Sequence, residues 1–332
     1  MEGKGRVCVT GAGGYLGSWV VKDLLHKGYT VHGTVRDPCD EKKNGHLKKL
    51  ENSSENLHIF KADLLDYQGL YNAVKGCTGV FHVACPVPGT RKVLDPEAEM
   101  LQPAIEGTVN ILKACTNANV KKVVIVSSLA TVMDNPNWPK DQPIDESCWS
   151  DVEFCRMFKN WYGVGKTIAE NKAWDYAKNT GLNLVTVCPS VVIGPMLQST
   201  LNASTSFLLE FMKDTKATVE NRNLPYVYVQ DTVDAIILAY EKPEAEGRYI
   251  CSAFTISSKE LVEKLKSMYP DYQYPTSFIE VEQLNSGKLN CKKLENLGLK
   301  FTPVDETLVN AVKNLEETGL LAVVHKHPDL AN

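Results

Sequence analysis

Two side chains that could transfer a proton lie one helical turn apart in the stretch NWYGVGK, residues 160–166. Residues four positions apart share a helix face, so a helix here would bring the Lys166 ammonium close to the Tyr162 phenol. A positive charge about 4 Å away at an effective dielectric of about 20 is worth roughly 4 kcal/mol, or about three pK units. The pair predicts a tyrosine that titrates near neutral pH and gives a proton to a carbonyl oxygen as hydride reaches the carbon.

The spacing alone is weak evidence, because Tyr71 and Lys75 repeat it elsewhere in the chain. The context separates the two pairs. Tyr162 lies downstream of a predicted strand that ends in Ser127-Ser128, and a serine there could hold the substrate oxygen beside the phenol. Tyr71 has no such neighbour, and we expect it on a surface helix.

A glycine-rich turn near the start of the chain predicts a dinucleotide site. In VTGAGGYLGSW, Gly11, Gly14 and Gly17 fall three positions apart between the first predicted strand and the first predicted helix, which Tyr15 and Leu16 enter. Glycines let the chain turn tightly and let a pyrophosphate approach the amides of the helix N-terminus. A merely tight turn is the alternative.

The end of the second predicted strand favours NADPH over NADH. An NAD site usually offers a carboxylate to the ribose there, whereas this strand ends in Val35-Arg36. Arg36 could pair with a 2'-phosphate, and Lys42 or Lys43 could add a second cation. The alternative is a solvated arginine that Asp37 partly neutralises.

Two further strand ends belong to the predicted cofactor site. Ligands of such sheets lie at the carboxyl ends of parallel strands. This places Asp63-Leu64 beside the adenine and Val83-Ala84-Cys85 beside the nicotinamide ribose. Either could instead be a plain strand terminus.

The elements that must position these residues follow an alternating pattern. Apolar, β-branched runs separated by helix-sized gaps predict buried strands at Arg6–Thr10, Thr30–Val35, Leu57–Lys61, Gly79–Ala84, Lys122–Ser127 and Asn183–Cys188. This alternation predicts an α/β fold with a doubly wound parallel sheet of the Rossmann type. We expect the cofactor domain over residues 1–190, with 226–250 returning to it.

After Pro189 the pattern loosens into a smaller mixed α/β lobe, mainly residues 191–332, which we expect to bind substrate. It contains predicted helices at 204–212 and 231–241, a short strand at 226–229, and a helix opened by the capping box Ser257-Ser258-Lys259-Glu260. No flexible linker separates the two parts, so the cleft is predicted between them.

Composition narrows the partners. The chain has 332 residues, 43% of them hydrophobic and 23% charged, with a net charge of -4. This balance gives no electrostatic case for nucleic acid or an anionic membrane, and the apolar runs are strand-sized. The ten cysteines show no Cys-x-x-Cys and are interpreted as reduced cytosolic thiols. No metal-ligand spacing occurs, and His325 and His327 are interpreted as an exposed tail.

The chain resembles, throughout its length, the extended short-chain dehydrogenases/reductases of the plant branch that holds cinnamoyl-CoA reductases and dihydroflavonol reductases. The matching stretches are VTGAGGYLGSW, GTVRDP, KADLLD, GVFHVACPV, DESCWSDVEFC, NWYGVGKT, PSVVIGP and EGRYIC. The resemblance implies NADPH as cofactor, a planar phenylpropanoid-type carbonyl substrate and a catalytic Ser128, Tyr162 and Lys166. It also implies that the nicotinamide end of the cofactor contacts Pro189, Val192 and Ser204.

The helix that carries Tyr162 contains two glycines, one that the family shares and one that departs from it. Each glycine in a helix interior costs roughly 1 kcal/mol relative to alanine. Gly165 matches the NWYCYGK stretch typical of cinnamoyl-CoA reductases, and we expect it where the helix passes close to cofactor and substrate. Gly163 replaces the family's cysteine. Cys155 is therefore expected to lack a local thiol partner, which argues against a redox switch.

A further departure bears on the substrate. Reductases that accept the CoA thioester resemble one another in a His-x-x-Lys pair on the helix after NAS and in an arginine of the later GRY strand. This chain has Phe207 and Glu210 in that helix and keeps Arg248, which could simply pair with Glu244 or Glu246. The missing cations predict an NADPH-dependent reductase of cinnamaldehyde-type aldehydes, a short-chain cinnamyl alcohol dehydrogenase.

Several alternatives remain open. Within enzymes they are cinnamoyl-CoA reductase itself or a related ketone or dihydroflavonol reductase. A regulatory protein that senses NADPH without turnover is a second class, and a nucleotide-sugar epimerase a third, which Arg36 disfavours. We expect a small aromatic aldehyde as partner, and a monomer or weak dimer.

Overall fold

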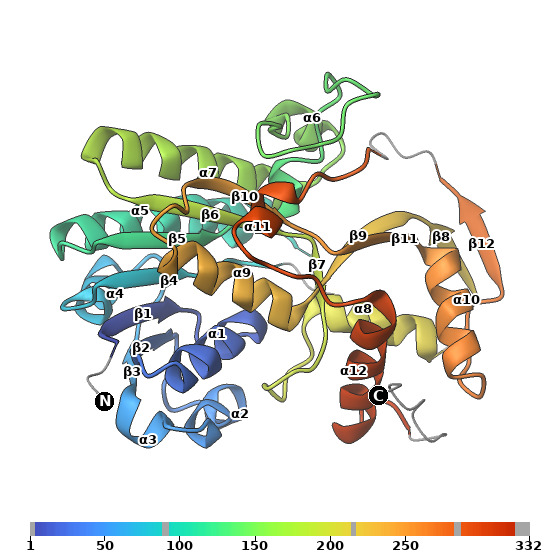
Figure 1. The fold of residues 1–332 in the computed structure, drawn as a ribbon, viewed down its shortest axis with the longest axis horizontal. Helices are drawn as coiled ribbons and strands as arrows, with labels where there is room; N and C mark the ends of the chain where they lie inside the picture. Colours follow the sequence, from blue (N-terminus) through green and yellow to red (C-terminus); the bar gives the residue numbers. More distant parts are fainter. Residues whose placement is uncertain (1–3, 88–92, 214–216, 282–286, 323–332) are drawn as a thin grey trace.

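The computed structural model describes residues 4–87, 93–213, 217–281 and 287–322. Its centre is a seven-stranded parallel sheet in the order β10-β6-β5-β4-β1-β2-β3. The predicted doubly wound sheet is thereby confirmed (Figure 1). The strands are β1 Arg6–Thr10, β2 Thr30–Val35, β3 Leu57–Lys61, β4 Gly79–His82, β5 Lys122–Val126, β6 Leu184–Pro189 and β10 Gly247–Cys251.

β4 and β5 end earlier than the sequence predicts. Beyond His82 the amides of Val83 and Ala84 both donate to the Thr10 hydroxyl, each at 3.1 Å. The Thr10 hydroxyl therefore accepts the amide hydrogen bonds that the backbone carbonyls of a neighbouring strand would otherwise accept, and the chain leaves the sheet. β4 therefore ends at His82, and the residue two positions on, Ala84, lies close to Gly11 after β1.

Helices cover both faces of the large sheet. One face packs against α1 (Tyr15–His26) and α9 (Val229–Glu241), and the other against α4 (Tyr67–Val74), α5 (Gln102–Asn117) and α7 (Trp161–Thr180). The interior consists mainly of fully buried valines, leucines and isoleucines from strands and helices. Short helices lie between β2 and β3, which are α2 Glu41–Asn44, η1 Leu47–Lys49 and α3 Ser53–Asn56. The short helix η2 (Glu97–Leu101) leads directly into α5, and η3 (Leu129–Thr131) and α6 (Val152–Met157) lie between β5 and α7.

The remaining elements build a smaller lobe with a core of its own, on the right in Figure 1. A mixed sheet in the order β11-β9-β7 and a parallel pair β12-β8 form its strands. The capping box is confirmed, because Ser257 and Glu260 exchange both capping bonds at the start of α10. The elements of this lobe are β7 Val191–Ile193, α8 Ala203–Met212, β8 Thr218–Asn221, β9 Asn223–Tyr228, β11 Phe254–Ser257, α10 Ser258–Met268, β12 Ser277–Glu280 and α12 Val304–Glu317, and α11 (Lys292–Asn296) lies between β12 and α12 in the chain.

The chain crosses between the two parts several times. After β7 and β9 it returns through α9 to β10, which pairs with β6. α11 then packs against β10, and Leu294 joins the core of the large sheet. The division at residue 190 with a return over 226–250 stays a prediction.

Two observations concern environment. No helix in the described ranges combines the length and apolar character that crossing a membrane requires. All ten cysteines are free thiols. His325 and His327 lie outside the described residues.

Candidate active site

The glycine-rich turn between β1 and α1 leaves room for a ligand at the helix N-terminus. Gly11 has φ +69°, and a Cβ on Gly17 would lie 2.1 Å from the Gly11 carbonyl oxygen. α1 begins after Gly14 without a side-chain cap. Amides that no side chain caps, beside a backbone that tolerates no Cβ, fit a dinucleotide pyrophosphate.

The two residues between Gly14 and Gly17 pack against the core of the large sheet. Tyr15 and Leu16 are partly buried against the core of the large sheet. The Tyr15 hydroxyl donates to the Gly194 carbonyl at 3.1 Å, just after β7. Tyr15 thus ties the cofactor turn to the segment that leads into the smaller lobe.

The predicted cations at the end of β2 differ in their surroundings. Arg36 is exposed, and the neighbouring Asp37 carboxylate accepts the Cys39 amide at 3.0 Å. Lys43 forms an ion pair with Asp40 at 2.9 Å. Lys42 is exposed beside it. Arg36 and Lys42 are therefore the better-placed partners for a 2'-phosphate.

The remaining predicted cofactor residues of the N-terminal part follow the ends of β3 and β4. Asp63 is exposed. Leu64 packs against Gly107 of α5, so closely that a Cβ on this glycine would lie only 2.7 Å from the Cβ of Leu64. Val83, Ala84 and Cys85 are partly buried. A Cβ on Gly11 would lie 3.0 Å from Ala84, so the first and fourth strand ends meet closely.

The structure brings Ser128, Tyr162 and Lys166 together. α7 begins after Asn160, whose side chain accepts the Gly163 amide. Tyr162 and Lys166 then lie one turn apart, and Ser128 follows β5 near enough to the phenol to act on its pKa. The Lys166 ammonium is buried and donates to the Val126 carbonyl at 2.9 Å.

The predicted lowering of the Tyr162 pKa is wrong for this structure. Burial raises the pKa of the phenol, although Lys166 and the hydrogen bond from Ser128 act to lower it. Burial also acts to lower the pKa of Lys166, but Cys85, Tyr162, Glu170 and Cys188 raise it above its ordinary value. The site at neutral pH therefore holds a protonated phenol beside an ammonium, the form that a proton donor needs.

A buried ion pair behind these residues is absent from the sequence-based prediction. Glu170 lies one turn beyond Lys166 on the same face of α7, and Arg248 of β10 donates to it at 2.9 Å. Glu170 also accepts hydrogen bonds from Ser127 at 2.5 Å and from Thr186 at 2.8 Å. The expected pairing of Arg248 with Glu244 or Glu246 is thus wrong. The four-residue spacing from Lys166 to Glu170 was the available signal.

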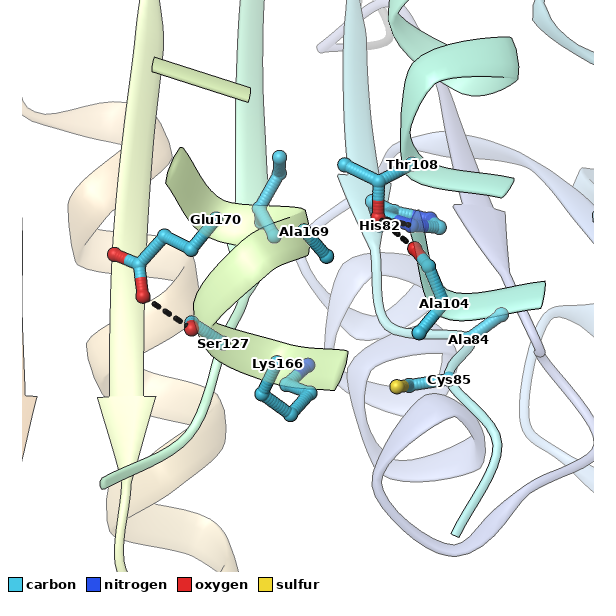
Figure 2. Close-up of a pocket in the computed structure, with 10 residues that line it drawn as sticks. His82, Ala84, Cys85, Ala104, Thr108, Ser127, Lys166, Ala169 and Glu170 are labelled. Carbon is cyan, nitrogen blue, oxygen red and sulfur yellow. Dashed lines mark hydrogen bonds between the residues drawn. The ribbon is translucent and has the colours of Figure 1, made fainter. Parts of the chain in front are cut away.

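A small internal cavity separates Lys166 from α5 (Figure 2). Its wall includes Cys85, Thr108 and His82, whose ring nitrogens lie 2.9 Å from the Thr10 hydroxyl and 3.4 Å from the Thr108 hydroxyl. Burial, with Lys166 nearby, lowers the pKa of His82 to about 3. His82 is therefore a neutral imidazole, which adds no positive charge beside the ammonium.

The two glycines of α7 have separate explanations. A Cβ on Gly163 would lie 2.7 Å from the side-chain nitrogen Nδ2 of Asn160. The same side chain caps the helix through its oxygen and donates from Nδ2 to Asp134 at 2.8 Å. A Cβ on Gly165 would meet Ala104 of α5 at an ordinary 3.7 Å. Gly165 faces this helix, so its predicted position against cofactor and substrate is wrong.

The remaining predicted residues lie toward the smaller lobe. Pro189 ends β6, Val192 is in β7, and Ser204 is in the first turn of α8, which Asn202 caps. Phe207 packs against the lobe core, with its ring centroid 4.7 Å from that of Phe211.

Cys155 is a buried free thiol with a carboxylate neighbour. Its sulfur lies 3.6 Å from an Asp134 oxygen, and burial, followed by Asp134, raises the pKa of Cys155 to about 12. No cluster of three or more metal-ligating side chains occurs among the residues that the structure describes.

Comparison with known proteins places this geometry in a family. The model of the NAD dependent epimerase/dehydratase family matches residues 7–251. Cinnamoyl-CoA reductase 1 of Petunia hybrida is 47% identical over 319 residues, 96% of this chain and 94% of that protein. Vestitone reductase from alfalfa, as a crystal structure, is 32% identical, with a TM-score of 0.81 over 96% of this chain and 100% of that one.

A second solved structure, of Gre2 from Candida albicans in complex with NADPH, is 28% identical with a TM-score of 0.77. It covers 94% of this chain and 99% of that one. The family match spans the glycine turn, the Tyr162 helix and all seven strands of the large sheet. The chain thus belongs to the NAD-dependent epimerase/dehydratase family of extended short-chain dehydrogenases/reductases, in the branch of the cinnamoyl-CoA reductases, and is an NAD(P)-dependent oxidoreductase.

Proposed function

We propose that this protein is an NADPH-dependent reductase of the carbonyl group of a hydroxycinnamoyl-type substrate. The observation that carries the proposal is the meeting of Tyr162, Lys166 and Ser128 at the carboxyl edge of the sheet. Tyr162 is protonated and can give its proton to a carbonyl oxygen. Ser128 can orient the same oxygen by a hydrogen bond, and the buried Lys166 ammonium stabilises negative charge as it develops on the phenol.

The residues at the glycine turn fit a dinucleotide, and NADPH when bound there supplies the hydride. Arg36 and Lys42 are exposed cations where an NADPH 2'-phosphate would lie. The related Gre2 structure contains NADPH. The remaining cofactor contacts proposed from sequence are Gly11, Gly14, Tyr15, Leu16, Gly17, Lys43, Asp63, Leu64, Val83, Ala84, Cys85, Pro189, Val192 and Ser204.

For the substrate, the names of the relatives favour a hydroxycinnamoyl-CoA thioester, which the enzyme would reduce to the aldehyde. This is the alternative to the free-aldehyde preference expected from the sequence. The free aldehyde is the second candidate. The observation in its favour is α8, where an aromatic ring and a carboxylate occupy Phe207 and Glu210.

Steady-state assays of NADPH consumption with feruloyl-CoA and coniferaldehyde test the proposal. We expect both to be turned over, with the higher kcat/KM for the thioester. A higher value for coniferaldehyde would favour the second candidate. No turnover of either substrate with NADPH, by protein that binds the cofactor, would contradict the proposed function.

A further inference from the structure

The buried Glu170–Arg248 pair joins three segments that are distant in sequence. Glu170 belongs to α7, its hydrogen-bond donor Ser127 follows β5, and Arg248 lies in β10. The side chains of the pair are 1% and 7% exposed, respectively. Figure 2 shows the carboxylate of Glu170 reaching Ser127 beside Lys166. The pair is thus one helical turn behind the proposed catalytic ammonium.

The guanidinium of Arg248 uses its remaining donors on the chain between β5 and α6. Nη1 donates to the carbonyls of Glu146 and Cys148 at 2.8 and 2.7 Å, and Nη2 donates to the Thr131 hydroxyl at 2.8 Å. The Thr131 hydroxyl donates in turn to the Ser128 carbonyl at 2.9 Å. Arg248 therefore fixes the backbone of the proposed catalytic serine through a single intervening side chain.

The flat face of the same guanidinium lies against an aromatic ring. The Arg248 Cζ is 3.6 Å from the ring centroid of Trp149, so residues 146–149 contact Arg248 through both carbonyls and a ring. The planar guanidinium, with its five N–H donors, can make all of these contacts at once, whereas the ammonium of a lysine, with three donors and no flat face, could not. With the donors of Arg248 used in this way, it has no free edge for a substrate phosphate.

We infer that Glu170 and Arg248 are positioning residues, whose buried pair holds the Ser128 turn and the 146–149 segment in register with Tyr162 and Lys166. The inference rests on the proposed function, because it takes these three residues as catalytic. Neither member of the pair contacts the substrate. The pair acts by fixing the distance and direction from the Ser128 hydroxyl to the phenol, on which efficient proton transfer depends.

Electrostatics supports this arrangement. Although burial acts to raise the pKa of Glu170, Arg248 and then Ser127 hold it below its ordinary value, so Glu170 is a carboxylate. Its charge is among those that keep Lys166 protonated. The groups that face Lys166 are Tyr162 and Glu170 on α7, Cys85 after β4, His82 on β4 and Cys188 on β6.

The experiment compares Glu170→Gln and Arg248→Lys with the unchanged enzyme, using coniferaldehyde and feruloyl-CoA as probes. Glu170→Gln keeps an acceptor but removes the charge, and Arg248→Lys keeps the charge but removes the fork. We expect kcat to fall at least tenfold in each, with the Kd for NADPH within twofold. In Glu170→Gln the basic limb of kcat should also move to lower pH, because Lys166 loses a nearby negative charge.

A double variant separates positioning from stability. Glu170→Gln with Arg248→Met removes the buried charge from both partners, so the melting temperature should recover relative to Arg248→Met alone. We expect kcat to stay low, because the Thr131 and 146–149 contacts are still missing. Recovery of kcat along with the melting temperature would overturn the inference and make the pair merely structural. Unchanged kcat in Glu170→Gln and Arg248→Lys would do the same.

Two further variants cover the other outcomes. If the charge variants fail to fold, Ser127→Ala removes only the hydroxyl that donates a hydrogen bond to Glu170. A loss of kcat smaller than twofold in this variant would then overturn the inference. Asp305→Asn removes an ion pair with Lys264 in the smaller lobe and should leave every readout unchanged. Tyr162→Phe in the same assays tests the proposed function separately: its retained activity would contradict that function, whatever the pair does.

Discussion

The carboxyl edge of the large sheet and helix α8 of the smaller lobe are the two regions to which the proposed function assigns the substrate, and they are built differently. At the sheet edge Lys166 and Glu170 are buried and held by hydrogen bonds and an ion pair, as Lys166 is by the Val126 carbonyl and Glu170 by Arg248. On α8, Phe207 and Glu210 are partly buried, and Phe207 packs against the core of the smaller lobe. Changes at the sheet edge should therefore alter the chemical step, and changes on α8 the choice of substrate.

The largest effect is expected from Tyr162→Phe, which removes the proton donor and leaves the ring. A general acid contributes about 10²–10⁴-fold, so kcat should fall by that amount in steady-state assays. NADPH binding, measured by fluorescence titration, should stay nearly unchanged. Tyr71→Phe is the matched control and should keep full activity. Loss of activity in the control instead would show that the wrong tyrosine was chosen.

The next effect concerns the cofactor end of the sheet edge. Arg36→Ala should lower the preference for NADPH over NADH by roughly tenfold, the loss expected for one hydrogen bond to a charged group. The ratio of kcat/KM values for the two cofactors measures it. Arg222→Ala removes an exposed arginine that pairs with Glu220 in the smaller lobe, and should leave the ratio unchanged. An unmodified enzyme without cofactor preference would refute the assignment of Arg36.

Helix α8 should respond with a smaller change of another kind. Phe207→His with Glu210→Lys replaces a carboxylate by a cation and adds a hydrogen-bond donor where the phosphates of CoA are expected, each exposed contact being worth up to about 1 kcal/mol. We expect kcat/KM for feruloyl-CoA to rise about fivefold, mostly through KM, with less change for coniferaldehyde. A matching rise for both substrates would mean that α8 does not discriminate between them.

The smallest effect separates the two glycines of α7. Alanine at either position gains helix propensity, roughly 1 kcal/mol in a helix interior. Only at Gly163 does the new Cβ displace the Asn160 cap, at a cost of about 1 kcal/mol. Gly165→Ala should therefore unfold at higher denaturant concentration than Gly163→Ala. Equal midpoints would show that the Asn160 cap adjusts without loss.

Much of the sheet edge could be predicted from the sequence, because the features that define it depend on residues close together in the chain. Strand ends, the glycine spacing and the four-residue step from Tyr162 to Lys166 all lie within short windows. The sign of the Tyr162 pKa shift could not be predicted in this way, because burial depends on segments from the whole chain. The same holds for Gly165, whose neighbour is a different helix.

The partner of Arg248 was also missed for a physical reason. Glu244 and Glu246 are near in sequence, but the side chain of Arg248 in β10 is buried against α7, where it meets Glu170. The spacing of charges along the sequence predicts ion pairs on solvated surfaces well, but it does not predict the partner of a charged side chain that a strand buries. The α8 residues are the converse case, since their places on one helix were predictable but their effect on the substrate depends on the fold around them.

The distance along the chain between Glu170 and Arg248 bears on how the enzyme folds. The two residues are 78 positions apart, and the intervening chain builds β7, α8, β8 and β9 before β10 pairs with β6. Contacts of such long range form late, because the loop between them must close first. During synthesis the first six strands emerge well before Arg248, so until then the nascent chain contains a Glu170 carboxylate without its partner. The Ser128 turn is therefore expected to reach its final register only as the last strand of the sheet docks.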